Sequence, residues 1–98
     1  MQIGIVGLGR MGANISRRLL HGGHQPVVYD IDPAIRAELG GEGATPADSL
    51  EAMMAALEAP RALWVMLPAG KITEGTIAHL GSILSPGDVV IDGGNTYD

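Results

Sequence analysis

The chain has 98 residues, 46% of them hydrophobic, with a formal net charge of −5 and no cysteine. This is enough for one small domain, and the acidic balance argues against a nucleic-acid surface, which needs a basic patch. The absence of cysteine excludes disulfides and thiolate metal sites, and the three histidines have no ligand-like spacing, so we expect no metal. No apolar run reaches the roughly 18 residues of a membrane span, and the first residues show no signal-peptide pattern. We therefore expect a cytoplasmic protein that binds neither nucleic acid nor membrane.

Short apolar runs alternate along the chain with helical patterns. The expected strands are 2–6, 27–29, 62–67 and 89–91, and the expected helices are 10–21, 34–39, 48–59 and 73–84. The segment 43–45 is either a very short strand or a connector. We expect helix ends at Gly22-Gly23, at Gly40-Gly41 and before Pro60, and a D-x-x-E start for the third helix at Asp48. Strict alternation with short connections predicts an α/β domain: a doubly wound parallel sheet with helices on both faces.

The chain has no internal repeat and no linker, so we expect one domain over residues 1–98. The alternation stops just after a strand, at a point where a doubly wound sheet would normally continue. We therefore expect this domain to be the N-terminal part of a longer protein.

A glycine-rich turn separates the first strand from the first helix. Gly7, Gly9 and Gly12 form the pattern G-x-G-x-x-G, and Asp30 follows 18 residues after Gly12, close to the ~20 of the dinucleotide fingerprint. The first glycine permits the tight turn, the second lets backbone approach a pyrophosphate, and the third allows close packing of the helix. Amides at the helix N-terminus, those of Arg10 and Met11 among them, would face the phosphates. The alternative is a tight structural turn without a ligand; we favour a Rossmann-type cofactor site because motif and context agree.

Asp30 also bears on the choice of cofactor. A carboxylate at the end of the second strand accepts hydrogen bonds from the ribose hydroxyls of NAD and repels the extra phosphate of NADP. No basic residue occupies Ile31 or Asp32, and Arg36, one helical turn further on, is a weak candidate for binding that phosphate. Asp32 itself fits a helix cap before Pro33 better than a cofactor contact. We therefore predict NAD rather than NADP.

Two further strand ends are predicted at the same edge of the sheet. Leu67-Pro68-Ala69-Gly70 has small residues that would let a loop lie along the cofactor, although an ordinary proline turn explains it equally well. Asn95, in the stretch Asp92-Gly93-Gly94-Asn95-Thr96, offers a donor and an acceptor for a polar substrate, with an Asx-type turn as the alternative. Ligands in open α/β sheets bind outside these carboxyl ends, so both stretches are candidate site residues.

These motifs together resemble one family. G-L-G-R-M-G-A-N at 7–14, L-P-A-G at 67–70 and I-D-G-G-N-T at 91–96 resemble the N-terminal domain of 6-phosphogluconate dehydrogenase, and the likeness covers essentially the whole chain. It is closest to the shorter bacterial form that tends to use NAD. The resemblance implies the decarboxylating oxidation of 6-phosphogluconate to ribulose 5-phosphate and CO2, a step of gluconate utilization and of the pentose phosphate pathway. Hydride would pass from the sugar C3 to the nicotinamide, without a metal.

The resemblance also implies roles for individual residues. The pyrophosphate would be held by the turn, the adenosine ribose by Asp30, and the substrate by the last strand end. The cofactor-binding set is Gly7, Leu8, Gly9, Arg10, Met11, Gly12, Tyr29, Asp30, Ile31, Leu67, Pro68, Ala69 and Asn95, and the substrate-binding set is Asn95 and Thr96. Many family members use NADP and carry Asn-Arg-Thr where this chain has Asp30-Ile31-Asp32, a departure that favours NAD. The family's catalytic Lys and Glu lie on later segments, so this chain contains no expected catalytic residue; its one lysine, Lys71, is expected in a loop.

Two other functions remain open from the sequence. One is the NAD-binding domain of a 3-hydroxyisobutyrate or tartronate-semialdehyde type reductase, which shares the glycine turn and Asp30 but usually has a serine-rich stretch in place of D-G-G-N. The other is a stand-alone module that senses NAD without catalysis. The full-length protein is expected to be a homo-oligomer acting on a sugar-acid phosphate, and the chain alone is expected to be inactive.

Overall fold

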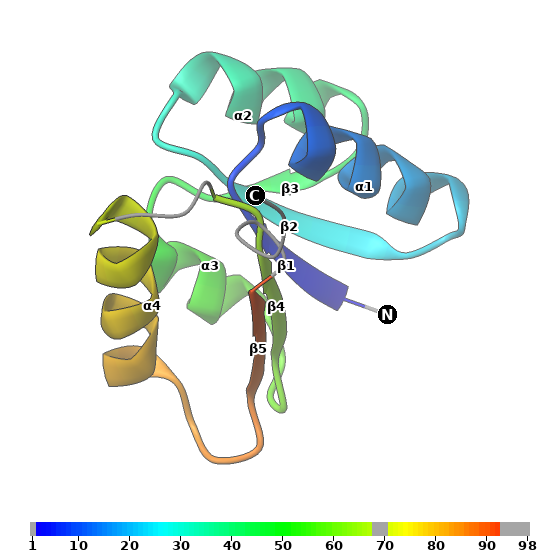
Figure 1. Cartoon of the computed structure of the whole chain (residues 1–98). Coiled ribbons are helices and arrows are strands. Elements are labelled where there is room, and N and C mark those ends of the chain that lie inside the picture. Colours follow the sequence, from blue (N-terminus) through cyan, green and yellow to red (C-terminus); the bar gives the residue numbers. More distant parts are fainter. Residues whose placement is uncertain (1, 68–70, 93–98) are drawn as a thin grey trace.

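The computed structural model describes residues 2–67 and 71–92, and within them it forms a five-stranded parallel sheet with four helices (Figure 1). The sheet order is β3-β2-β1-β4-β5, and each neighbouring pair is parallel. This confirms the doubly wound α/β fold. The strands are β1 (Gln2–Val6), β2 (Gln25–Tyr29), β3 (Thr45–Pro46), β4 (Ala62–Val65) and β5 (Val89–Asp92), and the helices are α1 (Arg10–His21), α2 (Pro33–Gly41), α3 (Leu50–Ala56) and α4 (Lys71–Ile83).

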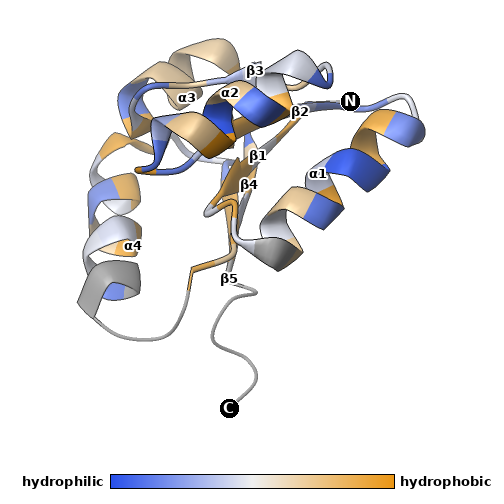
Figure 2. Cartoon of the chain, turned by 90° about the horizontal axis from the view of Figure 1, so that it is seen from above, coloured by the Kyte–Doolittle hydropathy of each residue, from blue (hydrophilic) through white to orange (hydrophobic). Residues whose placement is uncertain are grey.

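The strands alternate their side chains between two cores, one on each face of the sheet. Ile5 and Val28 pack with α1 and α2, whereas their neighbours Val6 and Val27 pack with α3 and α4. Figure 2 shows the apolar stripe of α1 beside its polar surface, as expected for a helix that covers one face of a sheet. Because both faces are covered, the central strands are apolar in their interiors, and polar side chains are left to the ends of the strands.

The end of α1 agrees with the sequence prediction. Gly22 is the C-cap, and Gly23 takes the left-handed conformation with φ +84°. The Gly23 amide donates to the Leu20 carbonyl at 3.1 Å, and the His24 amide donates to the Leu19 carbonyl at 2.9 Å. These two bonds form a Schellman motif, which turns the chain directly into β2.

The end of α2 was predicted two residues too early. Gly40 and Gly41 lie inside the helix, and the left-handed residue is Gly43, with φ +117°. The Ala44 amide donates to the Leu39 carbonyl at 3.1 Å, and both of these side chains are buried. The same Schellman motif therefore ends α2, and its buried Leu39–Ala44 pair decides which of the three glycines takes the left-handed position.

Both ends of α3 differ from the prediction. Ser49, not Asp48, is the N-cap, because its hydroxyl accepts from the Ala52 amide at 3.0 Å. The helix ends at Ala56 rather than near Ala59, since Gln2 on β1 accepts from the Glu58 amide and donates to the Ala56 carbonyl, both at 3.0 Å. A side chain more than fifty residues away ends this helix, so no local signal marks the position.

Smaller shifts affect the other boundaries. β2 begins at Gln25, so that Pro26 is its second residue, and β4 ends at Val65. The segment 43–45, for which the sequence allows either a short strand or a connector, contributes a strand residue, because Thr45 and Pro46 pair with β2. Lys71, expected in a loop, is the first residue of α4.

Candidate functional site

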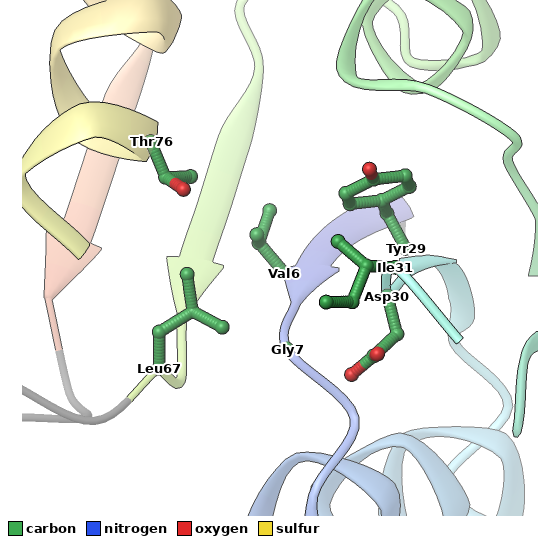
Figure 3. Close-up of a pocket in the computed structure, with 7 residues that line it drawn as sticks. All are labelled: Val6, Gly7, Tyr29, Asp30, Ile31, Leu67 and Thr76. Atoms are coloured by element: carbon green, nitrogen blue, oxygen red, sulfur yellow. The ribbon is translucent and has the colours of Figure 1, made fainter. Parts of the chain in front are cut away.

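The carboxyl ends of β1, β2 and β4 meet at one edge of the sheet and surround a cavity (Figure 3). Its volume is about 60 Å³, several times the roughly 10–15 Å³ that one water molecule needs in a cavity. The cavity opens beside the glycine turn, between the end of β2 and α4. It is lined by Val6, Gly7, Tyr29, Asp30, Ile31, Leu67 and Thr76.

Two of the three glycines are required by the protein's own packing. Gly7 has φ +94°, a conformation that side chains disfavour, and its amide donates to the Tyr29 carbonyl at 2.9 Å. A Cβ on Gly12 would lie 2.0 Å from the Gly7 carbonyl oxygen. The sequence predicted that Gly12 lets the helix pack on the strand; the close contact is with the turn itself. Gly7 and Gly12 thus hold the turn against the first turn of α1.

The middle glycine is different, because nothing in the protein fills the space beside it. A Cβ on Gly9 would have no neighbouring atom within 4 Å, and Gly9 is exposed. Gly9 is also the N-cap of α1, so no cap side chain satisfies the first amides of the helix. The first helical bond runs from the Ala13 amide to the Gly9 carbonyl at 2.9 Å, which leaves the amides of Arg10, Met11 and Gly12 ahead of it. An open backbone next to free helical amides is the cradle that a pyrophosphate needs.

Asp30 lies directly after β2 and turns its carboxylate toward the glycine turn (Figure 3). Its Oδ2 accepts from the Leu8 amide at 2.7 Å, and its Oδ1 accepts from the Asp32 amide at 2.9 Å. A carboxylate has about four acceptor positions, so about two remain available. The half-buried Asp30 therefore lies between the turn and the cavity and can accept further hydrogen bonds.

The neighbours of Asp30 have structural contacts of their own. Asp32 caps α2 by accepting from the Ala34 amide at 2.9 Å, as predicted. The Arg36 guanidinium donates to the backbone carbonyl of Asp30 at 3.2 Å and lies 6.0 Å from the centre of the Tyr29 ring. It does not contact the Asp30 carboxylate. Ile31 is 81% exposed at the rim of the cavity, a position in which an isoleucine gains nothing from the fold alone.

The structure brings most of the predicted site residues together. The turn residues, Tyr29, Asp30, Ile31 and Leu67 all lie at this edge. Leu8 points into the core, so only its backbone faces the site, whereas Met11 is 53% exposed. Pro68, Ala69, Asn95 and Thr96 lie outside the described residues. Thr76 was missed; its signal was that α4 follows β4 and so begins at the same edge.

The sequence model of the NAD binding domain of 6-phosphogluconate dehydrogenase matches residues 2–98. The chain belongs to this family. The NAD(+)-dependent, decarboxylating 6-phosphogluconate dehydrogenase of Haloferax volcanii is 39% identical over 97 residues, which are 99% of this chain and 32% of the relative. The enzyme of the same name from Bacillus subtilis is 36% identical over 97% of this chain and 21% of its own length. The chain thus spans about a third or less of these relatives.

Solved structures agree with this assignment. 6-phosphogluconate dehydrogenase from Plasmodium falciparum, described in its apo form and in complexes with NADP+ and with 6-phosphogluconate, superimposes with a TM-score of 0.89 at 25% identity; the match covers 99% of this chain and 22% of that one. A 3-hydroxyisobutyrate dehydrogenase from Salmonella typhimurium gives 0.73 at 26% identity, over 92% of this chain and 31% of that one. In the part of the chain that the structure describes, no helix has the length and apolar character needed to cross a bilayer.

Proposed function

We propose that residues 1–98 form the cofactor-binding domain of a longer, NAD-dependent 6-phosphogluconate dehydrogenase. That enzyme would convert 6-phosphogluconate to ribulose 5-phosphate and CO2, with NAD as the hydride acceptor. The observation that carries this proposal is the pairing of an open Gly9 cradle with the Asp30 carboxylate at one edge of the sheet. Family membership supports the reaction class, and the geometry of the site supports the choice of cofactor.

The domain's own residues would bind and orient the cofactor. The amides at the start of α1 would hold the pyrophosphate, and Asp30 would accept from the hydroxyls of the adenosine ribose. The cavity between Ile31, Leu67 and Thr76 would then receive the adjoining part of the nucleotide. Asn95 and Thr96 remain our candidates for substrate contact. The catalytic acid and base would come from segments beyond residue 98, and the full-length enzyme would be a homo-oligomer.

The preference for NAD over NADP rests on charge at the end of β2. Asp30 and Asp32 bring two carboxylates to the place where the 2′-phosphate of NADP would lie, and no described basic side chain pairs with Asp30 there. Arg36 is 6.0 Å from the Tyr29 ring and bonds backbone carbonyls, so its guanidinium is already engaged. The names of the Haloferax and Bacillus relatives, which specify NAD(+), point the same way.

Calorimetric titration of this chain with NAD and with NADP tests the proposal. We expect NAD to bind at least tenfold more tightly, on the order of 1.4 kcal/mol. Asp30→Ala should reduce this preference, whereas Asp48→Ala, which removes an exposed carboxylate outside the site, should leave it unchanged. Equal or tighter binding of NADP would contradict the cofactor assignment, and binding of neither by the folded chain would contradict the site.

A second candidate function is supported by the likeness to 3-hydroxyisobutyrate dehydrogenase. That class would use the same turn and Asp30, so cofactor binding does not separate the two. Turnover of 6-phosphogluconate and of 3-hydroxyisobutyrate by the full-length protein does. We expect activity with the sugar-acid phosphate, and activity with 3-hydroxyisobutyrate alone would favour the second candidate.

A further inference from the structure

Asp30 makes contacts that ribose recognition alone does not require. Its two carboxylate oxygens accept from two different backbone segments, the Leu8 amide in the turn at 2.7 Å and the Asp32 amide at 2.9 Å. The first of these bonds links residues 22 positions apart and joins the end of β2 to the middle of the glycine turn. A charged acceptor makes such a bond shorter and stronger than a neutral one does.

We propose that Asp30 is also a positioning residue, which holds the glycine turn in the conformation that binds the pyrophosphate. This inference rests on the proposed function. The carboxylate acts through the Leu8 amide: it fixes the Gly7–Leu8 peptide, one residue ahead of Gly9, and Gly9 is the open point of the cradle. Selection of the ribose and shaping of the phosphate site therefore depend on one side chain.

No other side chain of similar size reproduces this pair of bonds. An asparagine at position 30 would offer one oxygen and one NH2 group, so it could accept from Leu8 or from Asp32 but not from both in this geometry. The other amide would then face a donor. An alanine would leave both amides without their partner. Substitutions at Asp30 that aim to admit NADP should therefore weaken phosphate binding for both cofactors.

A cofactor analogue separates the two roles of Asp30. NAD whose adenosine ribose lacks the 2′ and 3′ hydroxyls cannot donate to the carboxylate, so a role in ribose recognition contributes nothing to its binding. If Asp30 holds the turn, Asp30→Asn should still lower the affinity for this dideoxy analogue, by about five- to tenfold. If the carboxylate were only a nearby negative charge, its removal would raise the affinity for the anionic analogue.

Asp48→Asn is the matched control. It makes the same change from carboxylate to amide at an exposed side chain that does not line the cavity. We expect its affinity for the dideoxy analogue to stay within twofold of the unaltered chain. Unchanged or increased affinity in Asp30→Asn would overturn the inference. Failure of the unaltered chain to bind NAD itself would instead contradict the proposed function.

A direct measurement needs no variant and no cofactor. In the labelled chain, NMR should detect scalar coupling across the hydrogen bond between the Leu8 amide nitrogen and the Asp30 carboxylate carbon, together with slow exchange of the Leu8 amide proton. Absence of the coupling with rapid exchange of that proton would overturn the inference even if Asp30→Asn fails to fold.

Discussion

Two aspartates, at opposite edges of the sheet, each accept hydrogen bonds from two backbone amides. Asp30, at the carboxyl edge, accepts from Leu8 and Asp32. Asp88, at the amino edge before β5, accepts from the Arg61 amide at 2.6 Å and the Ser85 amide at 2.9 Å. Asp88 has a third partner, because the Arg61 guanidinium donates to it at 3.1 Å.

The two carboxylates differ in how many of their acceptor positions remain free. The Asp88 side chain is fully buried, and three of its roughly four acceptor positions are taken by two amides and a guanidinium. These hydrogen bonds, first that from the Arg61 amide and then that from the Ser85 amide, lower the pKa of Asp88 below its ordinary value. Asp30 is half-buried at the mouth of a cavity, without a described cation on its carboxylate. The same arrangement closes a structural corner at one edge, and at the other it leaves a carboxylate with free acceptor positions beside a cavity.

The largest expected effects are on stability and NAD affinity, and they differ between two glycines of the turn that Asp30 contacts. Gly12→Ala should cost about 3 kcal/mol of stability and abolish cofactor binding, because its Cβ would lie 2.0 Å from the Gly7 carbonyl oxygen. Gly9→Ala should cost only about 0.5–1 kcal/mol, since its Cβ meets no atom within 4 Å and the loss is that of an alanine at the N-cap. It should nevertheless lower NAD affinity about tenfold or more, because the methyl group fills the phosphate cradle. Chemical denaturation and calorimetry measure both quantities; a Gly9→Ala chain that is as unstable as Gly12→Ala and binds NAD normally would contradict the open cradle.

At the amino edge, removal of the Asp88 carboxylate should lower stability without changing the NAD affinity. Asp88→Ala leaves two amides and a guanidinium without their acceptor, so we expect Tm to fall by about 5–10 °C. NAD affinity of the folded chain, measured well below Tm, should be unchanged, because the amino edge is not part of the site. Asp30→Ala is the reciprocal variant. It should lower the NAD affinity, which Asp88→Ala does not, and should lower Tm by less than Asp88→Ala does. Loss of NAD affinity in Asp88→Ala would show that the two edges are not independent.

Acid unfolding should depend on Asp88 in a defined pH range. Since its folded pKa is lower than the ordinary 3.8, the unfolded chain binds the proton more readily, and Asp88 stabilises the fold fully only above that ordinary value. This contribution disappears as pH falls through the lowered pKa. Asp88→Asn should therefore flatten the decline of unfolding free energy below about pH 4.

Glu42 provides the control for this pH dependence. Its pKa is also lowered, by a hydrogen bond from Arg17, but that pair is exposed to solvent. Glu42→Gln should flatten the acid limb less than Asp88→Asn does, and the effect should shrink in high salt. Curves for Asp88→Asn that run parallel to the unaltered chain would contradict the assignment of Asp88.

Local patterns in the sequence predicted the sheet, the glycine turn and the place of Asp30, because strand periodicity and a spaced motif determine them. The errors have non-local causes. The end of α3 depends on Gln2, and the end of α2 depends on the burial of Leu39 with Ala44. The Asp30–Leu8 bond requires the folded sheet and has no signature in the sequence. Thr76 had only an indirect signal, since α4 follows β4 and so begins at the same edge.

NMR mapping of NAD onto the amides of this chain tests the contrast between the two edges most directly. The expected result is that the amides of Leu8, Gly9 and Met11 shift on titration with NAD, while those of Arg61 and Ser85 do not. Shifts centred on the Arg61–Asp88 corner, or none at the turn at saturating NAD, would contradict the site proposed for this domain.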